Sequence, residues 1–121
     1  MSDVSELIGK TLIRIDNKND QELRFFLSEN EYYFMTHDQD CCEHVRIESI
    51  VGDLDDLIGE PILRAEESTS PEYDGEDESG TWTFYKFATR KGYVDIRWLG
   101  ESNGYYSESV SFGKYKIEEM I

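Results

Sequence analysis

Hydrophobic and polar residues alternate with a period of two along most of the chain, which predicts antiparallel β-strands. Short polar segments separate the alternating stretches, and Asn103-Gly104 is a strong signal for a two-residue hairpin turn. Residues 45–50 stay ambiguous between strand and helix, because the alternation stops at Ile50. The predicted strands are Thr11–Asp16, Glu22–Ser28, Tyr32–Thr36, Ile62–Glu67, Trp82–Thr89, Tyr93–Leu99 and Tyr105–Phe112.

Two stretches fifty residues apart resemble each other. Residues 6–16 (ELIGKTLIRID) align with residues 56–66 (DLIGEPILRAE), and both contain Leu-Ile-Gly. In each, acidic residues precede a short apolar segment, a glycine follows it, and a strand pattern comes next. This order is typical of a short capped helix that ends in a left-handed glycine. We therefore predict class α+β, mostly antiparallel β: a helix-plus-three-strand unit occurs twice, with an extra C-terminal strand and two short helices.

The length of 121 residues predicts one domain over residues 1–121, with an acidic loop at about residues 66–80. No window approaches the roughly 20 apolar residues that span a bilayer. The N-terminal residues lack the basic start and the long apolar region of a secretion signal. Cys41 and Cys42 are adjacent, which is too close for an ordinary disulfide. These features predict a cytoplasmic protein without membrane contact.

Charge is concentrated in blocks, within a net charge of −15. Residues 43–78 carry thirteen Asp and Glu against two Arg, a balance of −11, whereas residues 81–117 carry three acids against six bases, a balance of +3. Self-repulsion of this size costs stability, so the acid favours a role with a basic partner. Duplex nucleic acid and anionic lipid are disfavoured as direct partners, because both are polyanions. The oligomeric state is left open.

A face that imitates DNA is the first functional hypothesis. Duplex DNA carries one charge per about 1.7 Å of its axis, and carboxylates at a comparable spacing can occupy the basic channel of a nucleic-acid-binding protein. Glu43 and Glu48 belong to the same predicted face. The alternative for the acidic run at residues 66–80 is a solvated loop. The residues predicted to bind the partner are Asp53, Asp55, Asp56, Glu60, Glu76, Asp77 and Glu78.

The C-terminal sheet supports a second hypothesis, a small-ligand or nucleotide-binding module. Ten of the sixteen aromatic residues lie between Trp82 and Tyr115, where they alternate with basic residues. Aromatic rings beside basic side chains stack on nucleotide bases, although the same alternation is typical of a half-buried core. The ligand-binding residues in this hypothesis are Lys86, Arg97, Trp98 and Tyr105.

Residues 37–44 (HDQDCCEH) contain the ligand types that zinc accepts. Adjacent cysteines seldom reach one ion, and no second cysteine pair completes the pattern of a structural zinc site, so a turn without metal is the simpler interpretation. A metal-stabilised structural domain, with His37, Cys41, Cys42 and His44 as ligands, is the third hypothesis. The same thiols and imidazoles carry no catalytic signature. We predict no enzyme activity and no cofactor.

Three parts of the sequence together resemble a known family: HDQDCCE (residues 37–43), IVGDLDDLIG (50–59), and TWTFY (81–85) with GESNGYYSE (100–108). It is an uncharacterised family of small proteins encoded by bacteriophages and bacteria, carried as a domain of unknown function.

The resemblance covers roughly Leu7 to Phe112 and transfers no catalytic residue. It implies a phage or mobile-element accessory protein that acts in a bacterial host cell. Small acidic proteins in that setting often block host nucleases or CRISPR effectors. By this analogy we expect a non-enzymatic inhibitor of the anti-CRISPR or anti-restriction type.

Overall fold

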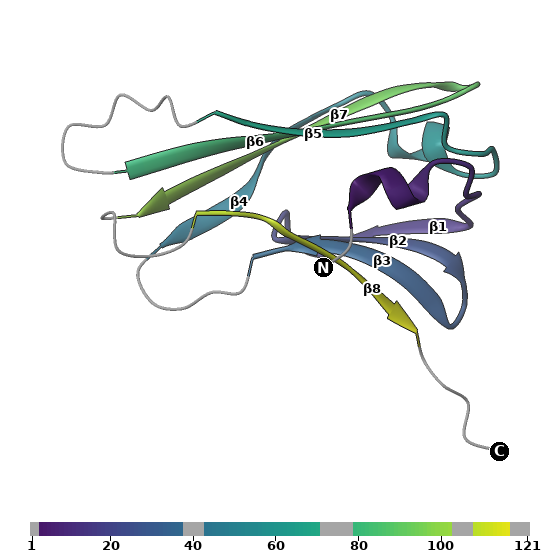
Figure 1. The fold of residues 1–121 in the computed structure, drawn as a ribbon, viewed down its shortest axis with the longest axis horizontal. Coiled ribbons are helices and arrows are strands. Elements are labelled where there is room, and N and C mark those ends of the chain that lie inside the picture. Colours follow the sequence, from purple (N-terminus) through teal and green to yellow (C-terminus); the bar gives the residue numbers. More distant parts are fainter. Residues whose placement is uncertain (1–2, 38–42, 71–78, 103–107, 117–121) are drawn as a thin grey trace, which may run out of the picture.

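Two four-stranded antiparallel sheets pack face to face and form one β-sandwich (Figure 1). The computed structural model describes residues 3–37, 43–70, 79–102 and 108–116. The first sheet has the order β1-β2-β3-β8, and the second has the order β4-β7-β6-β5. The prediction of a mostly antiparallel β class is confirmed. The strands are β1 (Arg14–Asn17), β2 (Glu22–Ser28), β3 (Glu31–Thr36), β4 (His44–Val51), β5 (Arg64–Ser70), β6 (Ser79–Thr89), β7 (Gly92–Ser102) and β8 (Ser111–Lys116).

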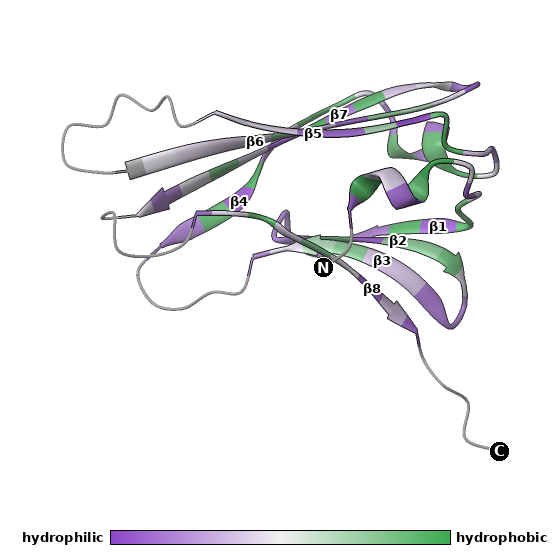
Figure 2. Ribbon diagram, viewed as in Figure 1, coloured by the Kyte–Doolittle hydropathy of each residue, from purple (hydrophilic) through white to green (hydrophobic). Residues whose placement is uncertain are grey.

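The core lies between the sheets and consists of inward-facing side chains from both. Phe25 of β2 packs against Phe87 of β6, with ring centroids 5.6 Å apart. Trp98 of β7 donates its indole N–H to the sulfur of Met35 in β3 at 3.3 Å, which joins the two sheets again. Apolar positions recur along the strands of both sheets (Figure 2). This is the pattern that period-two alternation produces when one face of each strand is buried.

The last strand of each half of the chain joins the sheet of the other half. β1, β2 and β3 form the first sheet, but the next strand, β4, pairs with β7 in the second. Likewise β5, β6 and β7 form the second sheet, but β8 pairs with β3, where Met35 lies opposite Phe112. The chain therefore crosses between the sheets after β3 and again after β7. Neither sheet is complete without a strand from the other half.

The Asn103-Gly104 signal predicts that the strands before and after it pair with each other. This prediction is wrong, because β7 and β8 belong to different sheets. Residues 103–107 lie outside the described residues, and β8 begins at Ser111. β7 already has β4 and β6 as its neighbours, so neither edge of β7 is open to β8. A turn signal reports a local backbone preference, whereas the partner of the strand depends on which sheet buries Phe112.

The two predicted helices are also wrong, because each is a single 3-10 turn. η1 spans Val4–Leu7 and η2 spans Leu54–Leu57. Asp3 and Asp53 cap these turns, since each carboxylate accepts a hydrogen bond from the N–H two residues later. Four residues are too few to offset the cost of nucleating an α-helix. No helix among the described residues has the length and apolar character needed to cross a membrane.

The helix-plus-three-strand unit with an extra C-terminal strand is corrected as well. The ambiguous segment forms β4. Within the described residues, the first half of the chain therefore has one 3-10 turn, η1, and four strands, β1 to β4. The second half has one 3-10 turn, η2, and four strands, β5 to β8. A bulge between Ile47 and Ser49 interrupts the β4–β7 pairing. An extra residue in a strand shifts the following side chains to the opposite face, which explains why the alternation stops at Ile50.

The acidic loop expected at residues 66–80 is shorter than predicted. β5 continues to Ser70, and β6 begins at Ser79. The segment between these strands, residues 71–78, lies outside the described residues. Strand pairing in this region tolerates polar residues because β5 is an edge strand, with one of its faces open to solvent.

The two Leu-Ile-Gly segments meet and exchange main-chain hydrogen bonds. Gly9 donates its N–H to the carbonyl oxygen of Ile62 at 2.7 Å, and Gly59 donates to that of Leu12 at 2.9 Å. Both glycines have a φ of 86°, a left-handed conformation that favours glycine. The side chains of Leu12 and Ile62 are buried in the core. This junction connects the segment before β1 to the segment before β5, and so links the two sheets.

Gly59→Ala should lower the free energy of unfolding by about 1 kcal/mol, because alanine is strained at positive φ. A Cβ at Gly59 has no neighbour within 4 Å, so no steric clash is added. Gly52 also has a positive φ, of 102°, but its Cβ would lie 2.3 Å from the carbonyl oxygen of Tyr93. Gly52→Ala should therefore destabilise the protein more. Urea denaturation measures both variants, and equal losses would contradict this distinction.

Candidate functional site

Four of the predicted partner-binding carboxylates lie on η2 or directly beside it, with Asp53 before the turn and Glu60 after it. Asp53 and Asp55 are exposed, whereas Asp56 and Glu60 are partly buried. Lys91, between β6 and β7, donates a hydrogen bond from its ammonium group to the carbonyl oxygen of Asp55 at 3.2 Å. Because of this contact, η2 is docked against the second sheet, and the cation offsets part of the negative charge of the turn.

The other predicted acids do not join this group within the described structure. Glu76, Asp77 and Glu78 lie outside the described residues. The chain leads to them from Ser70 at the end of β5, whereas η2 precedes the start of β5 at Arg64. In the sequence, η2 therefore precedes β5, whereas the segment with Glu76, Asp77 and Glu78 follows it.

Glu43 is not part of an acidic face, which corrects the prediction for this residue. It is 4% exposed, directly before β4, and its carboxylate lies beside the imidazole of His37. Glu48 is exposed on β4, which is the edge strand farthest from β5 in the second sheet. A carboxylate in a run of acids is normally solvated, and nothing in the local sequence distinguishes Glu43 from its neighbours.

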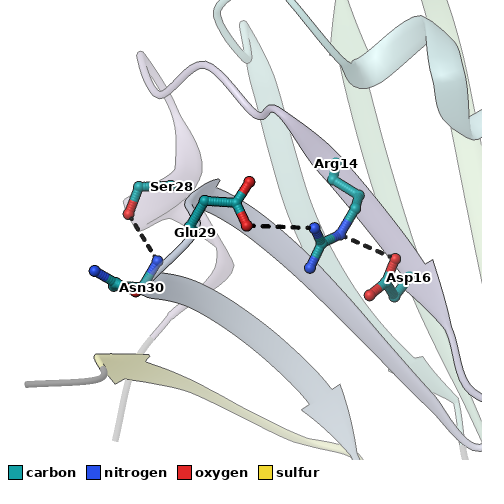
Figure 3. A network of polar contacts seen from close by, with 5 residues as sticks. All are labelled: Arg14, Asp16, Ser28, Glu29 and Asn30. Carbon is teal, nitrogen blue, oxygen red and sulfur yellow. Dashed lines mark hydrogen bonds and ion pairs between the residues drawn. The ribbon is translucent and has the colours of Figure 1, made fainter.

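Many further carboxylates pair with basic side chains of their own sheet. Figure 3 shows Arg14 of β1 between Asp16, at 3.3 Å, and Glu29, at 3.8 Å. Exposed pairs of this kind add little stability, but they cancel charge locally. The negative surplus of the described residues therefore rests on carboxylates outside these pairs, such as those of η2. The other pairs are Arg24–Glu22, Arg46–Glu101, Arg64–Glu66 and Lys114–Glu31.

A groove of about 500 Å³, the acidic groove, opens beside η1 between the two sheets. Hydrogen bonds from Ser5 lower the pKa of Asp3, and the Arg64 guanidinium lowers the pKa of Glu66, so both carboxylates are ionised at neutral pH. The groove suits a long basic side chain, whose methylene groups contact apolar residues while its cation meets the carboxylates. Its lining residues are the apolar Val4, Ala65, Val110 and Phe112 and the acidic Asp3, Glu66 and Glu67.

The sequence analysis missed the acidic groove, because its walls come from η1, β5 and the segment leading into β8. These elements are far apart along the chain, and only the strand exchange brings them together. One local signal was present: Asp3 stands fifty residues before Asp53, and both are caps of a turn. That match identifies Asp3 as a cap but does not place it beside Glu66 and Glu67.

The outer face of the second sheet carries Lys86 and Arg97, but not Trp98. Both basic residues are exposed, whereas Trp98 is fully buried. Neighbouring residues of a strand point to opposite faces, so Arg97 and Trp98 do not share a face. The prediction of Trp98 as a ligand-binding residue is therefore wrong, and Tyr105 lies outside the described residues.

Trp82 of β6, and not Trp98, is the tryptophan that accompanies the basic residues of this sheet. The Arg97 guanidinium lies over the Trp82 ring, 4.9 Å from its centroid. A shallow groove of about 180 Å³ on the same sheet is lined by Phe84, Lys86 and Arg97, among others. The β6–β7 register, which sets Phe84 opposite Arg97, decides which rings accompany the basic residues. The amino-acid composition of the two strands does not predict this register.

The predicted metal segment is described only at its two ends. Cys41 and Cys42 lie outside the described residues, and His44 is exposed on β4. His37 and Glu43 are buried together, with Nε2 of His37 lying 3.4 Å from a carboxylate oxygen of Glu43. No group of three His, Cys, Asp or Glu side chains within the described ranges is arranged to hold a metal ion. Of the four predicted ligands, the structure therefore describes only the two histidines.

These features define a two-sheet antiparallel β-sandwich with grooves between and beside its sheets. A family model described as "Domain of unknown function (DUF7448)" matches residues 5–112, and the chain belongs to this family. The predicted membership of an uncharacterised family is thus confirmed, while an origin in bacteriophages or bacteria stays a prediction. No curated protein and no solved structure matches the chain.

Acid should weaken the sandwich through the Glu31–Lys114 pair, which joins β3 to β8 at 2.9 Å. The hydrogen bond from Lys114 lowers the pKa of Glu31 below its ordinary value of 4.5. The contribution of this carboxylate to stability is therefore complete above that value and is lost as the pH falls through the pKa of the folded state. The difference in unfolding free energy between wild type and Glu31→Gln should shrink as the pH is lowered from neutral into this range.

Urea denaturation at a series of pH values measures this difference. In a Lys114→Met background, Glu31→Gln should no longer alter the pH dependence, because the partner that lowers the pKa of Glu31 is gone. A difference that persists in this background would show that the ion pair is not the cause.

Proposed function

We propose that this chain is a non-enzymatic binding protein that inhibits a basic, nucleic-acid-handling protein. The observation that supports this function is the acidic groove, which is lined by Asp3, Glu66 and Glu67 together with apolar residues. A lysine or arginine side chain of the partner enters the groove and lays its stem against Phe112. Its cation then forms charge-assisted hydrogen bonds with the carboxylates of Asp3 and Glu67, since Glu66 is already paired with Arg64.

Carboxylates near the groove extend the negative surface. η1 and η2 lie toward the same end of the sandwich (Figure 1), and η2 carries Asp53, Asp55 and Asp56. With a net charge of −15, the chain attracts a basic partner from a distance and excludes acidic competitors. Association through such a surface is fast and weakens as salt screens the charges.

In its finer form, the proposal is an inhibitor of host defence that imitates DNA, of the anti-CRISPR or anti-restriction type, in the cytoplasm of a bacterial host cell. The resemblance to proteins encoded by bacteriophages and bacteria supports this setting. Glu60 adds one more carboxylate beside η2. Glu76, Asp77 and Glu78 belong to this proposal by their sequence alone, since they lie outside the described residues. Duplex DNA is not a direct partner in this proposal, because two polyanions repel each other.

A second candidate function is the binding of a nucleotide on the outer face of the second sheet. In this arrangement a base stacks on the exposed part of Trp82 or Phe84, and Lys86 and Arg97 take the phosphate. The groove there measures about 180 Å³, whereas small-molecule pockets usually hold about 300–1,000 Å³. The acidic groove is therefore the better-supported site.

We also propose that the two halves of the chain are copies of one unit, a 3-10 turn followed by four strands. The support is the match between residues 6–16 and residues 56–66, the equal φ of Gly9 and Gly59, and their reciprocal hydrogen bonds. Two copies that exchange their fourth strand account for the order of strands in both sheets.

Charge reversal tests the acidic surface. We expect Glu67→Lys, and the pair Asp55→Lys with Asp56→Lys, to raise the Kd for the partner about tenfold or more, which corresponds to roughly 1.4 kcal/mol. Glu29→Lys is the matched control for the single variant, because it changes the net charge equally on an exposed turn of the first sheet. The partner is first captured from bacterial lysate on the immobilised full chain at low salt and identified by mass spectrometry.

Two outcomes would count against the proposal. If Glu29→Lys weakens binding as much as Glu67→Lys, net charge acts alone and the groove has no special role. If the protein captured at low salt is not basic, or is retained equally well at high salt, an acidic docking surface does not explain the binding.

Trp82→Ala and Arg97→Gln test the nucleotide alternative. If a nucleotide binds this face, millimolar nucleotide should raise the melting temperature of the wild type, and both variants should lose this rise. Trp98→Ala is a poor probe, because loss of a buried tryptophan opens a core cavity and destabilises the protein with or without ligand. A wild-type melting temperature that does not respond to nucleotides would remove this candidate.

A further inference from the structure

β5 is an edge strand without the features that usually prevent an edge from pairing. It stands at the end of the order β4-β7-β6-β5, so β6 is its one neighbouring strand among the described residues. An open edge presents main-chain N–H and C=O groups to other strands, and proteins protect such edges with short strands, lysines, prolines or bulges. β5 has seven residues, pairs with β6 without a bulge, and contains neither lysine nor proline.

The other three edge strands each have one of these protective features. β1 is only four residues long. β4 has a bulge between Ile47 and Ser49, and β8 carries Lys114 and Lys116. The difference between β5 and these strands identifies β5 as the edge of the described structure that is best suited to receive another strand.

Glu67 lies on the side of β5 that faces the core. In the β5–β6 register it is opposite Tyr85, whose side chain is fully buried, and opposite residues of paired strands share a face. Burial and the nearby Glu67 carboxylate raise the pKa of the Tyr85 hydroxyl, which makes no hydrogen bond to the described residues. Within the described residues, no ion pair joins Glu67 to a basic side chain, whereas Glu66 pairs with Arg64.

A charged residue on the core side of an edge strand either prevents pairing or binds an opposite charge. The acidic groove favours the second role, because Glu67 lines it together with Asp3 and the apolar Phe112. A strand added to β5 runs about 4.8 Å from it, and every second side chain of that strand points to the core side. Such side chains reach the acidic groove, whose volume of about 500 Å³ accommodates a lysine or arginine.

We propose that the open edge of β5 binds an extended basic segment of the partner as an added strand, with lysine or arginine at alternate positions entering the acidic groove. This inference rests on the proposed function and names the form of the segment that docks. Main-chain hydrogen bonds hold such a strand, and the alternate cations select it. A shift of one residue would turn the cations away from the groove. A second copy of β5 is not the occupant, because like charges would then face each other.

Three synthetic peptides of equal charge test the proposal by isothermal titration calorimetry on the full chain. The first alternates its residues, Thr-Lys-Thr-Lys-Thr-Lys-Thr, and the second has the same composition with its lysines together, Thr-Thr-Lys-Lys-Lys-Thr-Thr. The third is the alternating peptide with N-methylated main-chain amides, which cannot donate hydrogen bonds. We expect the alternating peptide to bind in a 1:1 ratio, and the other two to have a Kd about tenfold higher or more.

NMR of the wild type locates the peptide without any substitution. The alternating peptide should shift the main-chain amide resonances of β5 and leave those of the β1 and β4 edges in place. Glu67→Gln should raise the Kd for this peptide about tenfold, because it removes the charge but keeps the shape of the side chain. Glu29→Gln is the matched control on an exposed turn of the first sheet and should leave the Kd unchanged.

The outcomes separate this inference from the proposed function. If all three peptides bind equally well, charge acts alone: the edge assignment falls, while an acidic docking surface survives. If the alternating peptide does not bind, the edge assignment also falls, and Glu67 serves to protect the edge from pairing. If the peptide adds to β5 but the protein captured from lysate is not basic, the edge assignment stands and the proposed function falls.

Discussion

The main-chain hydrogen bonds between the two Leu-Ile-Gly segments are the contact on which the rest of the sandwich depends. Gly9 and Gly59 bond through their main-chain N–H groups to Ile62 and Leu12, whose side chains are buried in the core. A left-handed glycine in each segment lets the chain turn from a capped 3-10 turn directly into this contact. The contact sets η1 against β5 and η2 against the β6–β7 end, and it thereby decides where their carboxylates lie.

A chain with a net charge of −15 folds because its acids are distributed over positions where charge is tolerated. Some carboxylates cap turns, and others pair with arginine or lysine across a sheet face. Arg14 also lies over the Phe26 ring, 3.9 Å from its centroid, on the outer face of the first sheet. The surplus that remains around η1, η2 and β5 is available for a partner. Glu43 departs from this rule, since it is buried beside His37.

Both the acidic groove and the His37–Glu43 pair result from the strand exchange. The groove needs β8 beside η1 and β5, and the pair needs the crossing after β3 to lie against the crossing before β8. Sites at such crossings combine residues from distant parts of the chain and are held by the same contacts that hold the sheets. A substitution at either place is therefore expected to affect the stability of the whole sandwich.

The sequence by itself determined the strands and the character of their faces. Alternation placed β2 at its observed bounds and located the starts or ends of β3, β6 and β7 within a few residues, because one buried face imposes a period of two. It also grouped Lys86 with Arg97, which are exposed on the neighbouring strands β6 and β7, and it identified the four acids at and beside η2. Tertiary structure alone decided that Trp98 is core, that Glu43 is buried, and that β8 leaves β7 for β3. The physical reason is that the hydrophobic period of a strand shows which of its residues share a face. Which strand pairs with the edge of a sheet, and which residues line a groove, depend on contacts between residues far apart in the chain.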